Sequence, residues 1–195
     1  TVGLMDAHIS ALDPEAESYA REVTAALEEY AIEASISKIL GSETLFRISD
    51  HGIQILGGYG FSEEYPMARV FRNTRIDRIW EGTNEINRMV IYGYYLKKVL
   101  MEELPLRDAE KVWSQTQPSS DGPLAGEIQT MDVARRLTVK CLFEAVSQYG
   151  QDLRNEQVVG EDLADLVIGY YAASSAINRL LQLDDGTQRD PAYRA

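Results

Sequence analysis

The feature that most constrains the fold is an apolar stripe at helical spacing that begins after Pro14. Most of its members recur every three or four positions, as on one face of an α-helix, and Gly41 is the only glycine within it before Gly52. The pattern predicts one helix of about 40 residues, roughly 60 Å long at the standard rise. Such a helix must pack along its length against other helices. The stripe consists of Tyr19, Val23, Leu27, Tyr30, Ala34, Ser37, Leu40, Leu45, Ile48 and Ile55.

Other stretches also have helical spacing. Residues 1–12 are predicted to be the end of a helix, and residues 84–100 are predicted to form a helix that Thr83 caps. Two later helices are predicted at residues 127–149 and 156–183. No segment with the two-residue period of a strand is long enough to count. The sequence therefore predicts an all-α protein, a helical bundle with one very long helix followed by a second small helical unit.

Proline and glycine set the predicted domain boundaries. Residues 105–126 contain three prolines and two glycines, a composition typical of a connector. We therefore predict a helical domain at 1–104, a linker at 105–126, an additional helical region at 127–183 and a polar tail at 184–195. The chain opens on Thr1 within an apolar periodic run, so we expect it to be cut from a longer protein.

The charge balance limits the choice of partner. Lys and Arg number 19 against 31 Asp and Glu, a net charge of −12. Nucleic acid is not expected, because it requires a basic face, and docking on anionic lipid is disfavoured. A membrane role for residues 127–183, through Arg135, Arg136 and Lys140, is a less favoured alternative to packing or dimerisation. Cys141 is the only cysteine, which excludes an intramolecular disulfide, and its apolar flanks favour a core position.

Turn residues, aromatic residues and arginines crowd into residues 52–88. Gly57, Gly58 and Gly60 are expected to end the long helix, and they form no dinucleotide fingerprint because no strand precedes them. The arginines recur every three residues. Ion pairs with the nearby acids would explain them, and so would anchoring of a bound anion or of a catalytic loop; ion pairing is the commoner case. These arginines are Arg69, Arg72, Arg75 and Arg78.

One carboxylate, Glu81, lies on a glycine-containing bend just before the helix that Thr83 caps. A helix N-terminus offers free backbone N–H groups to a bound oxygen. Trp80 beside Glu81 would partly desolvate the carboxylate and suit it to act as a general base near neutral pH. The commoner role of a glutamate in such a place is that of a solvated partner of the helix dipole.

Three motifs in this region resemble, in order and spacing, the C-terminal α-helical domain of the acyl-CoA dehydrogenases. They are QILGGYGF at 54–61, EYPMARVFRNTRI at 64–76 and IWEGTNEINR at 79–88. A fourth stretch, EEYAIEASISKILGSE at 28–43, most resembles the very-long-chain subgroup, as do the extra helices after residue 105. The resemblance covers residues 1–104 strongly and the remainder loosely.

The resemblance implies an enzyme that uses FAD to convert a fatty acyl-CoA to a trans-2-enoyl-CoA. Glu81 matches the carboxylate that removes the α-proton, and the backbone N–H at this position helps to polarise the thioester carbonyl. Gly82 matches a substrate contact. The residues that match FAD-contacting segments are Thr83, Asn84 and Glu85, and, toward the ADP portion of the FAD of a neighbouring subunit, Gln54, Ile55, Leu56, Gly57 and Gly58. The implied partners are the acyl-CoA, an electron-transferring flavoprotein and further copies of the chain in a homodimer or tetramer; no metal is expected.

Two departures and several alternatives accompany this interpretation. Asn73 stands where the family commonly has Asp, and the amino-terminal helical domain and middle β-domain of the family are absent. A related acyl-CoA oxidase would share the motifs but pass its electrons to O₂. The 195 residues alone are expected to be an inactive helical assembly module. The expected location is cytoplasmic if the source is bacterial, and the mitochondrial matrix or inner-membrane face if it is eukaryotic.

Overall fold

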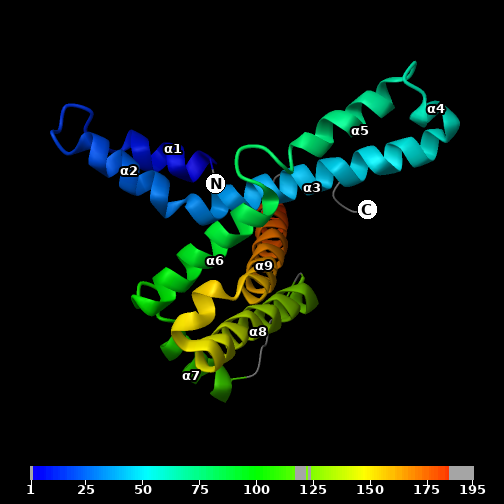
Figure 1. Ribbon diagram of the computed structural model, residues 1–195. Coiled ribbons are helices and arrows are strands. Elements are labelled where there is room, and N and C mark those ends of the chain that lie inside the picture. The colour runs from blue at the N-terminus through cyan, green and yellow to red at the C-terminus, as the bar shows by residue number, and fades with distance from the viewer. Residues whose placement is uncertain (1, 117–121, 123, 185–195) are drawn as a thin grey trace. The chain divides into compact units, whose positions relative to one another are not determined.

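The computed structural model describes residues 2–116, 122 and 124–184, and every regular element within these ranges is a helix (Figure 1). The all-α prediction is therefore confirmed. The chain divides into two compact units, Thr1–Leu96 and Lys97–Ala195, and each is described by itself. Among the described residues, no helix combines the length and the apolar character needed to cross a membrane.

The first unit is built around α3, against which α4 and α5 pack. Figure 1 shows α3 and α5 side by side, with the short α4 at the turn that joins them. The helices α1 and α2 form a second pair. The bounds are α1 (Val2–Ser10), α2 (Tyr19–Glu29), α3 (Ala31–Leu56), α4 (Gly58–Phe61), α5 (Pro66–Ile76) and α6 (Asn84–Leu100), the last of which ends in the second unit.

The prediction of one helix of about 40 residues is wrong. Residues 11–18 form turns, α2 begins at Tyr19, and the helix breaks at Tyr30, whose φ of −98° and ψ of 12° are not helical. The Tyr30 ring meets the edge of the His8 ring on α1, with centroids 6.1 Å apart. A break of a single residue leaves the three-to-four-residue spacing of apolar side chains almost unchanged, so the pattern does not reveal it.

Small side chains bring α3 and α5 close together. The hydroxyls of Ser49 and Thr74 are both buried and lie 3.1 Å apart, and the rings of Phe46 and Phe71 also pack together, tilted by 34° with centroids 4.9 Å apart. Gly60 is buried where α4 meets α3, and a Cβ there would lie 2.6 Å from the carbonyl oxygen of Ile53. Any residue other than glycine would push α4 away from α3.

The second unit is a small helical bundle. It contains α7 (Leu106–Gln115), α8 (Ala125–Tyr149), the 3₁₀ helix η1 (Gly150–Asn155) and α9 (Gln157–Asp184). Leu142, Leu153 and Ala164 are buried at its centre, and Gly150, with a φ of +55°, follows the last residue of α8. Cys141 is exposed, so its predicted core position is wrong; the core position is its neighbour Leu142.

Helix α7 lies within the stretch predicted to be a linker, so that prediction is wrong for residues 106–115. Two arginines of α8 attach this helix. Arg136 donates to the carbonyl oxygens of Trp113 and Thr116 at the C-terminal end of α7, where free carbonyls need donors. The Arg135 guanidinium lies 4.6 Å from the centroid of the Trp113 ring. Residues 117–121 and 123 of the predicted linker, and 185–195 of the predicted tail, lie outside the described residues.

Candidate active site

The bend at residues 77–83 joins α5 to α6 and carries Glu81 and Gly82. Backbone hydrogen bonds close it at both ends: the N–H of Trp80 donates to the carbonyl of Ile76 at 3.1 Å, and that of Asn84 to the carbonyl of Arg78 at 3.1 Å. Glu81 and Gly82 have φ values of +52° and +81°. This left-handed conformation suits glycine, but it costs a residue such as glutamate about 1–2 kcal/mol. The bend therefore requires support from outside itself.

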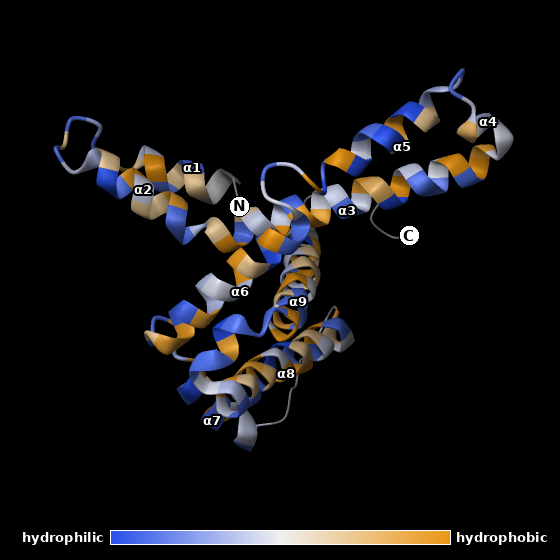
Figure 2. Cartoon of the chain, viewed as in Figure 1, coloured by the Kyte–Doolittle hydropathy of each residue, from blue (hydrophilic) through white to orange (hydrophobic). Residues whose placement is uncertain are grey.

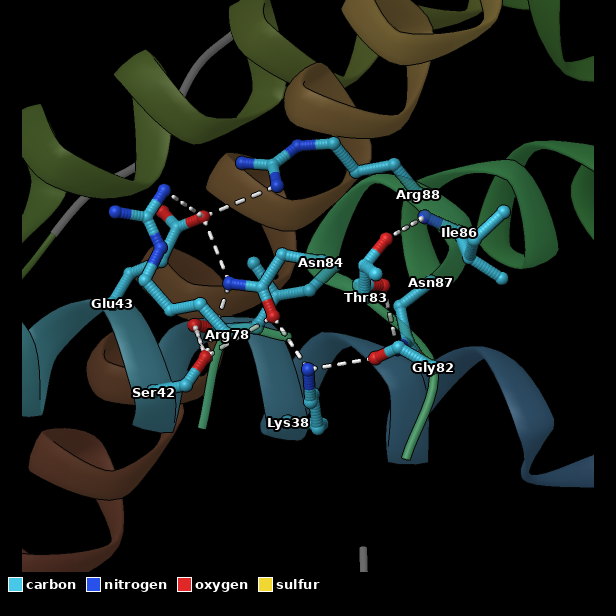
Figure 3. A network of polar contacts seen from close by, with 11 residues as sticks. Lys38, Ser42, Glu43, Arg78, Gly82, Thr83, Asn84, Ile86, Asn87 and Arg88 are labelled. Carbon is cyan, nitrogen blue, oxygen red and sulfur yellow. Dashed lines mark hydrogen bonds and ion pairs between the residues drawn. The ribbon is translucent and has the colours of Figure 1, made fainter. Parts of the chain in front are cut away.

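Two side chains hold the carbonyl oxygen of Gly82 (Figure 3). The ammonium of Lys38, on α3, donates to it at 2.8 Å. The side-chain amide of Asn87, one turn into α6, donates to the same oxygen at 2.8 Å and to the carbonyl of Thr83 at 3.0 Å. A Cβ on Gly82 would lie 3.0 Å from the Asn87 amide nitrogen. Both its φ and its neighbour therefore favour glycine at position 82.

Asn84, the first residue of α6, is the centre of a buried network between α3 and the bend (Figure 3). It is 0% exposed. Its amide nitrogen donates to the Ser42 hydroxyl at 3.0 Å and to Glu43 Oε1 at 3.1 Å, and its amide oxygen accepts from Lys38 Nζ at 2.7 Å. Buried polar groups of this kind must be hydrogen-bonded to be tolerated. Asn84 therefore fastens the start of α6 to α3.

Glu43 joins this network to two arginines. Arg88 on α6 donates to Glu43 Oε1 at 3.1 Å, and Arg78 in the bend approaches the same atom to 3.8 Å. Burial raises the pKa of the Glu43 carboxyl, but the hydrogen bonds from Arg88 and Asn84 and the charges of both arginines together outweigh it and hold the pKa below its ordinary value. Arg78 thus forms an ion pair, as the commoner prediction for the arginine cluster required, although its partner is Glu43 of α3.

Thr83 caps α6 as predicted. Its hydroxyl accepts from the backbone N–H of Ile86 at 3.2 Å, which satisfies one of the free donors of the first turn. Glu85 is exposed in that turn. Its own backbone N–H and the Thr83 hydroxyl both bond to its carboxylate, and they hold the pKa of Glu85 below its ordinary value.

Glu81 itself is exposed, and the neighbouring Trp80 is 55% exposed. The predicted desolvation of Glu81 by Trp80 is therefore wrong for the part of the chain that the structure describes. The physical reason is the left-handed bend, which presents residues 79–82 outward from α3 and α6. What the described residues supply is a carboxylate on a firmly anchored backbone.

The second predicted group, residues 54–58, lies at the far end of α3. Ile55 is 84% exposed, and Leu56 and the two glycines that follow are exposed as well. Gly57 ends α3 with a φ of +57°, and a Cβ on Gly57 or Gly58 would meet nothing within 4 Å. Figure 2 shows hydrophobic positions continuing along this end of α3. Gln54 follows Lys38 by 16 positions on one helix, roughly 24 Å, so one chain does not bring the two predicted groups together.

The residues that support the bend could not be recognised from the sequence. Three of them, Lys38, Ser42 and Glu43, lie on α3, 39 or more positions before Gly82. Their signal is a run of polar positions, spaced four and one apart, that alternates with the buried positions Ile36 and Ile39. The other two, Asn87 and Arg88, follow the bend on α6 and lie within the motif at 79–88.

Comparison with known proteins agrees with this geometry. Residues 2–95 match the family model described as "Acyl-CoA dehydrogenase, C-terminal domain". This match identifies residues 2–95 as an acyl-CoA dehydrogenase C-terminal domain, and it confirms the family that the motifs predicted.

Individual relatives extend the similarity beyond residue 95. A probable acyl-CoA dehydrogenase of Bacillus subtilis (strain 168) is 38% identical over 185 residues, which are 92% of this chain and 31% of that protein. The mitochondrial very long-chain specific acyl-CoA dehydrogenase of Bos taurus is 32% identical over 84% of this chain and 29% of its own length. A crystal structure of an acyl-CoA dehydrogenase complexed with FAD from Bacillus anthracis aligns with a TM-score of 0.87 at 39% identity, over 95% of this chain and 32% of that one. The chain therefore spans about a third of the length of these relatives.

Proposed function

We propose that this chain is the C-terminal part of an FAD-dependent acyl-CoA dehydrogenase that converts a fatty acyl-CoA to a trans-2-enoyl-CoA, with Glu81 as the catalytic base. One observation carries the proposal: an exposed glutamate is held in a left-handed conformation, at a φ of +52°, on a bend anchored by side chains of α3 and α6. The family match and the relatives support the same reaction. An exposed carboxylate with this much backbone support is prepared for contact with something outside the described residues.

The residues of the bend have distinct roles in this proposal. The Glu81 carboxylate accepts the α-proton of the thioester, and its backbone N–H donates to the thioester carbonyl, where negative charge develops as the proton leaves. The N-terminus of α6, beginning at Asn84, adds the positive end of a helix dipole near that charge. Gly82 leaves room for the acyl-CoA beside the base.

FAD, when bound, supplies the acceptor for the hydride from the β-carbon. The exposed backbone at Gly57 and Gly58 fits close approach of a diphosphate, because a Cβ there would fill open space, and the exposed Ile55 fits burial by a partner. This segment lies roughly 24 Å along α3 from the Glu81 bend. That separation supports a homodimer or tetramer in which each chain contributes residues to two different sites. Within residues 83–85, the exposed Glu85 and half-buried Thr83 suit a cofactor contact better than the fully buried Asn84.

Finer assignments stay predictions. The very-long-chain subgroup is supported by the alignment with the bovine protein, but the Bacillus subtilis relative, whose name gives no chain length, is the more similar of the two over this chain. Transfer of electrons to an electron-transferring flavoprotein, rather than to O₂ as in an oxidase, is proposed on the family match. Relatives from a bacterium and from mitochondria leave both predicted locations open, and the domain boundaries at 104 and 126 also stay proposals.

The test uses the full-length protein that contains this chain. Anaerobic addition of a fatty acyl-CoA should bleach the flavin absorbance, and Glu81→Gln should slow that bleaching by roughly 10²–10⁴-fold, whereas the exposed control Glu63→Gln should not. Assays of peroxide release and of reduction of an electron-transferring flavoprotein then separate oxidase from dehydrogenase. If the flavin of Glu81→Gln bleached at the normal rate, Glu81 would not be the base. If no acyl-CoA bleached the flavin of the unmodified protein, the proposed reaction would be wrong.

A further inference from the structure

Lys38 makes a contact with the bend that ordinary packing does not require. It lies in the first third of α3, 43 positions before Glu81, and its ammonium contacts two acceptors on either side of Thr83. Nζ lies 2.8 Å from the carbonyl oxygen of Gly82 and 2.7 Å from the side-chain oxygen of Asn84. One cation thus joins Gly82 of the bend to Asn84, the first residue of α6 (Figure 3).

This contact fixes the part of the backbone that decides where Glu81 is presented. The Gly82 carbonyl defines the plane of the peptide between Gly82 and Thr83, and both Lys38 and Asn87 donate to it. Hydrogen bonds from an ionised donor are roughly twice as strong as neutral ones. Because Glu81 and Gly82 are both left-handed, a free bend would relax toward commoner conformations and move the carboxylate.

The buried partners of Lys38 are held in turn. Asn84 cannot swing away from the ammonium, because its amide nitrogen is bound to Ser42 and to Glu43, and Glu43 is bound by Arg88. The side chain that receives the Lys38 charge is therefore rigid, as expected of a group whose own neighbours orient it.

We propose that Lys38 is a positioning residue for proton abstraction: it clamps the Gly82 carbonyl and the Asn84 amide so that the Glu81 carboxylate stays aimed at the substrate α-carbon. This inference rests on the proposed function. A misplacement of a reacting group by about 1 Å can cost 10²-fold in rate. Loss of the clamp should therefore lower kcat far more than it changes substrate binding.

The experiment compares Lys38→Met, Lys38→Arg and the exposed control Lys97→Met in the full-length holoenzyme. Methionine keeps the apolar stem and removes the charge. We expect Lys38→Met to lower kcat per bound flavin by roughly 10²-fold, to leave KM and flavin content within about threefold, and to enlarge the isotope effect of an α-deuterated acyl-CoA. Lys38→Arg should recover part of the loss, because a guanidinium restores the charge but not the geometry.

A second readout does not depend on activity. Trypsin can cut after Arg78 only when the bend opens, so cleavage there reports the open population. Lys38→Met should raise that cleavage rate by at least about tenfold over both the unmodified protein and Lys97→Met. Unchanged cleavage, or an unchanged kcat per bound flavin in an active enzyme, would overturn the proposal. If the unmodified protein turned over no acyl-CoA, the proposed function would fail and with it the role in proton abstraction, while the cleavage rate would still decide whether the clamp exists.

Discussion

Replacing Asn84 by alanine should loosen the start of α6 more than any other single truncation in the site. The change removes a side chain that exposes no surface. It deletes the donors to Ser42 and Glu43 and the acceptor of Lys38. Alanine cannot replace any of them, and the cavity it leaves lies between α3 and α6.

The size of the effect follows from these partners. A hydrogen bond to a charged group contributes about 1.5–3 kcal/mol, and a neutral one about 1 kcal/mol. Two of the partners, Lys38 and Glu43, are charged, but both are only partly buried and can recover some hydration. The Ser42 hydroxyl keeps its bond to the Ile39 carbonyl, at 3.2 Å. We therefore expect a loss of about 2–4 kcal/mol in the free energy of opening this segment.

Hydrogen exchange in the full-length protein measures that free energy locally. Peptides that cover residues 84–90 should exchange roughly 30- to 700-fold faster in Asn84→Ala than in the unmodified protein, since about 1.4 kcal/mol corresponds to a factor of ten. Asn73→Ala is the matched control, because Asn73 is exposed within α5 and alanine is the better helix former. If Asn84→Ala accelerated exchange by less than about fivefold, or no more than Asn73→Ala, the network would not hold α6 as described.

Three further predictions concern other parts of the chain. Gly82→Ala should lower turnover of the full-length enzyme by at least about tenfold, because a side chain at a φ of +81° is strained by about 1–2 kcal/mol and its Cβ would lie 3.0 Å from the Asn87 amide; normal kinetics would contradict this. The folded-state pKa of Glu43 lies below its ordinary value of 4.5, so its pairing with Arg88 stabilises the fold above that pH and the stabilisation is lost as pH falls through the lowered pKa. The difference in thermal midpoint between the unmodified protein and Glu43→Gln should therefore shrink from pH 7 to pH 3, and a difference that grew with acid would refute it. Arg136→Ala should lower the free energy of opening α7 by about 1–3 kcal/mol, which hydrogen exchange at residues 106–115 would report as faster exchange. Unchanged exchange there would show that other contacts hold the helix.

The fold class could be predicted because helical spacing is a local property. Apolar residues that recur every three or four positions indicate a helix whatever it packs against. The break at Tyr30 could not be predicted, because one non-helical residue hardly shifts the apolar pattern. Helix α7 could not be predicted for another reason. It has only 10 residues, follows Pro105 and precedes a stretch rich in proline and glycine, so the composition of the whole stretch is that of a linker.

In the candidate site, too, some features could be predicted from the sequence and others could not. The bend and the Thr83 cap could be predicted from neighbouring residues, because a cap and its helix are adjacent in sequence. The role of Asn84 as a buried hub depends on Lys38, Ser42 and Glu43, which lie 41 to 46 positions earlier. Such contacts follow from how α3 and α6 meet, and no spacing rule encodes them. The prediction that Trp80 desolvates Glu81 was wrong for a similar reason, because a tryptophan that is adjacent in sequence need not cover its neighbour in space.

The role of Glu81 as the base can be measured by following the α-proton alone. An acyl-CoA with sulfur in place of the β-carbon cannot lose a hydride from that position, but its α-protons can still exchange with D₂O when a base removes them. The full-length protein should catalyse this exchange, measured by mass spectrometry, and Glu81→Gln should slow it by at least about 10²-fold while Glu63→Gln does not. Exchange at the unmodified rate in Glu81→Gln would contradict the account, because another group would then be the base.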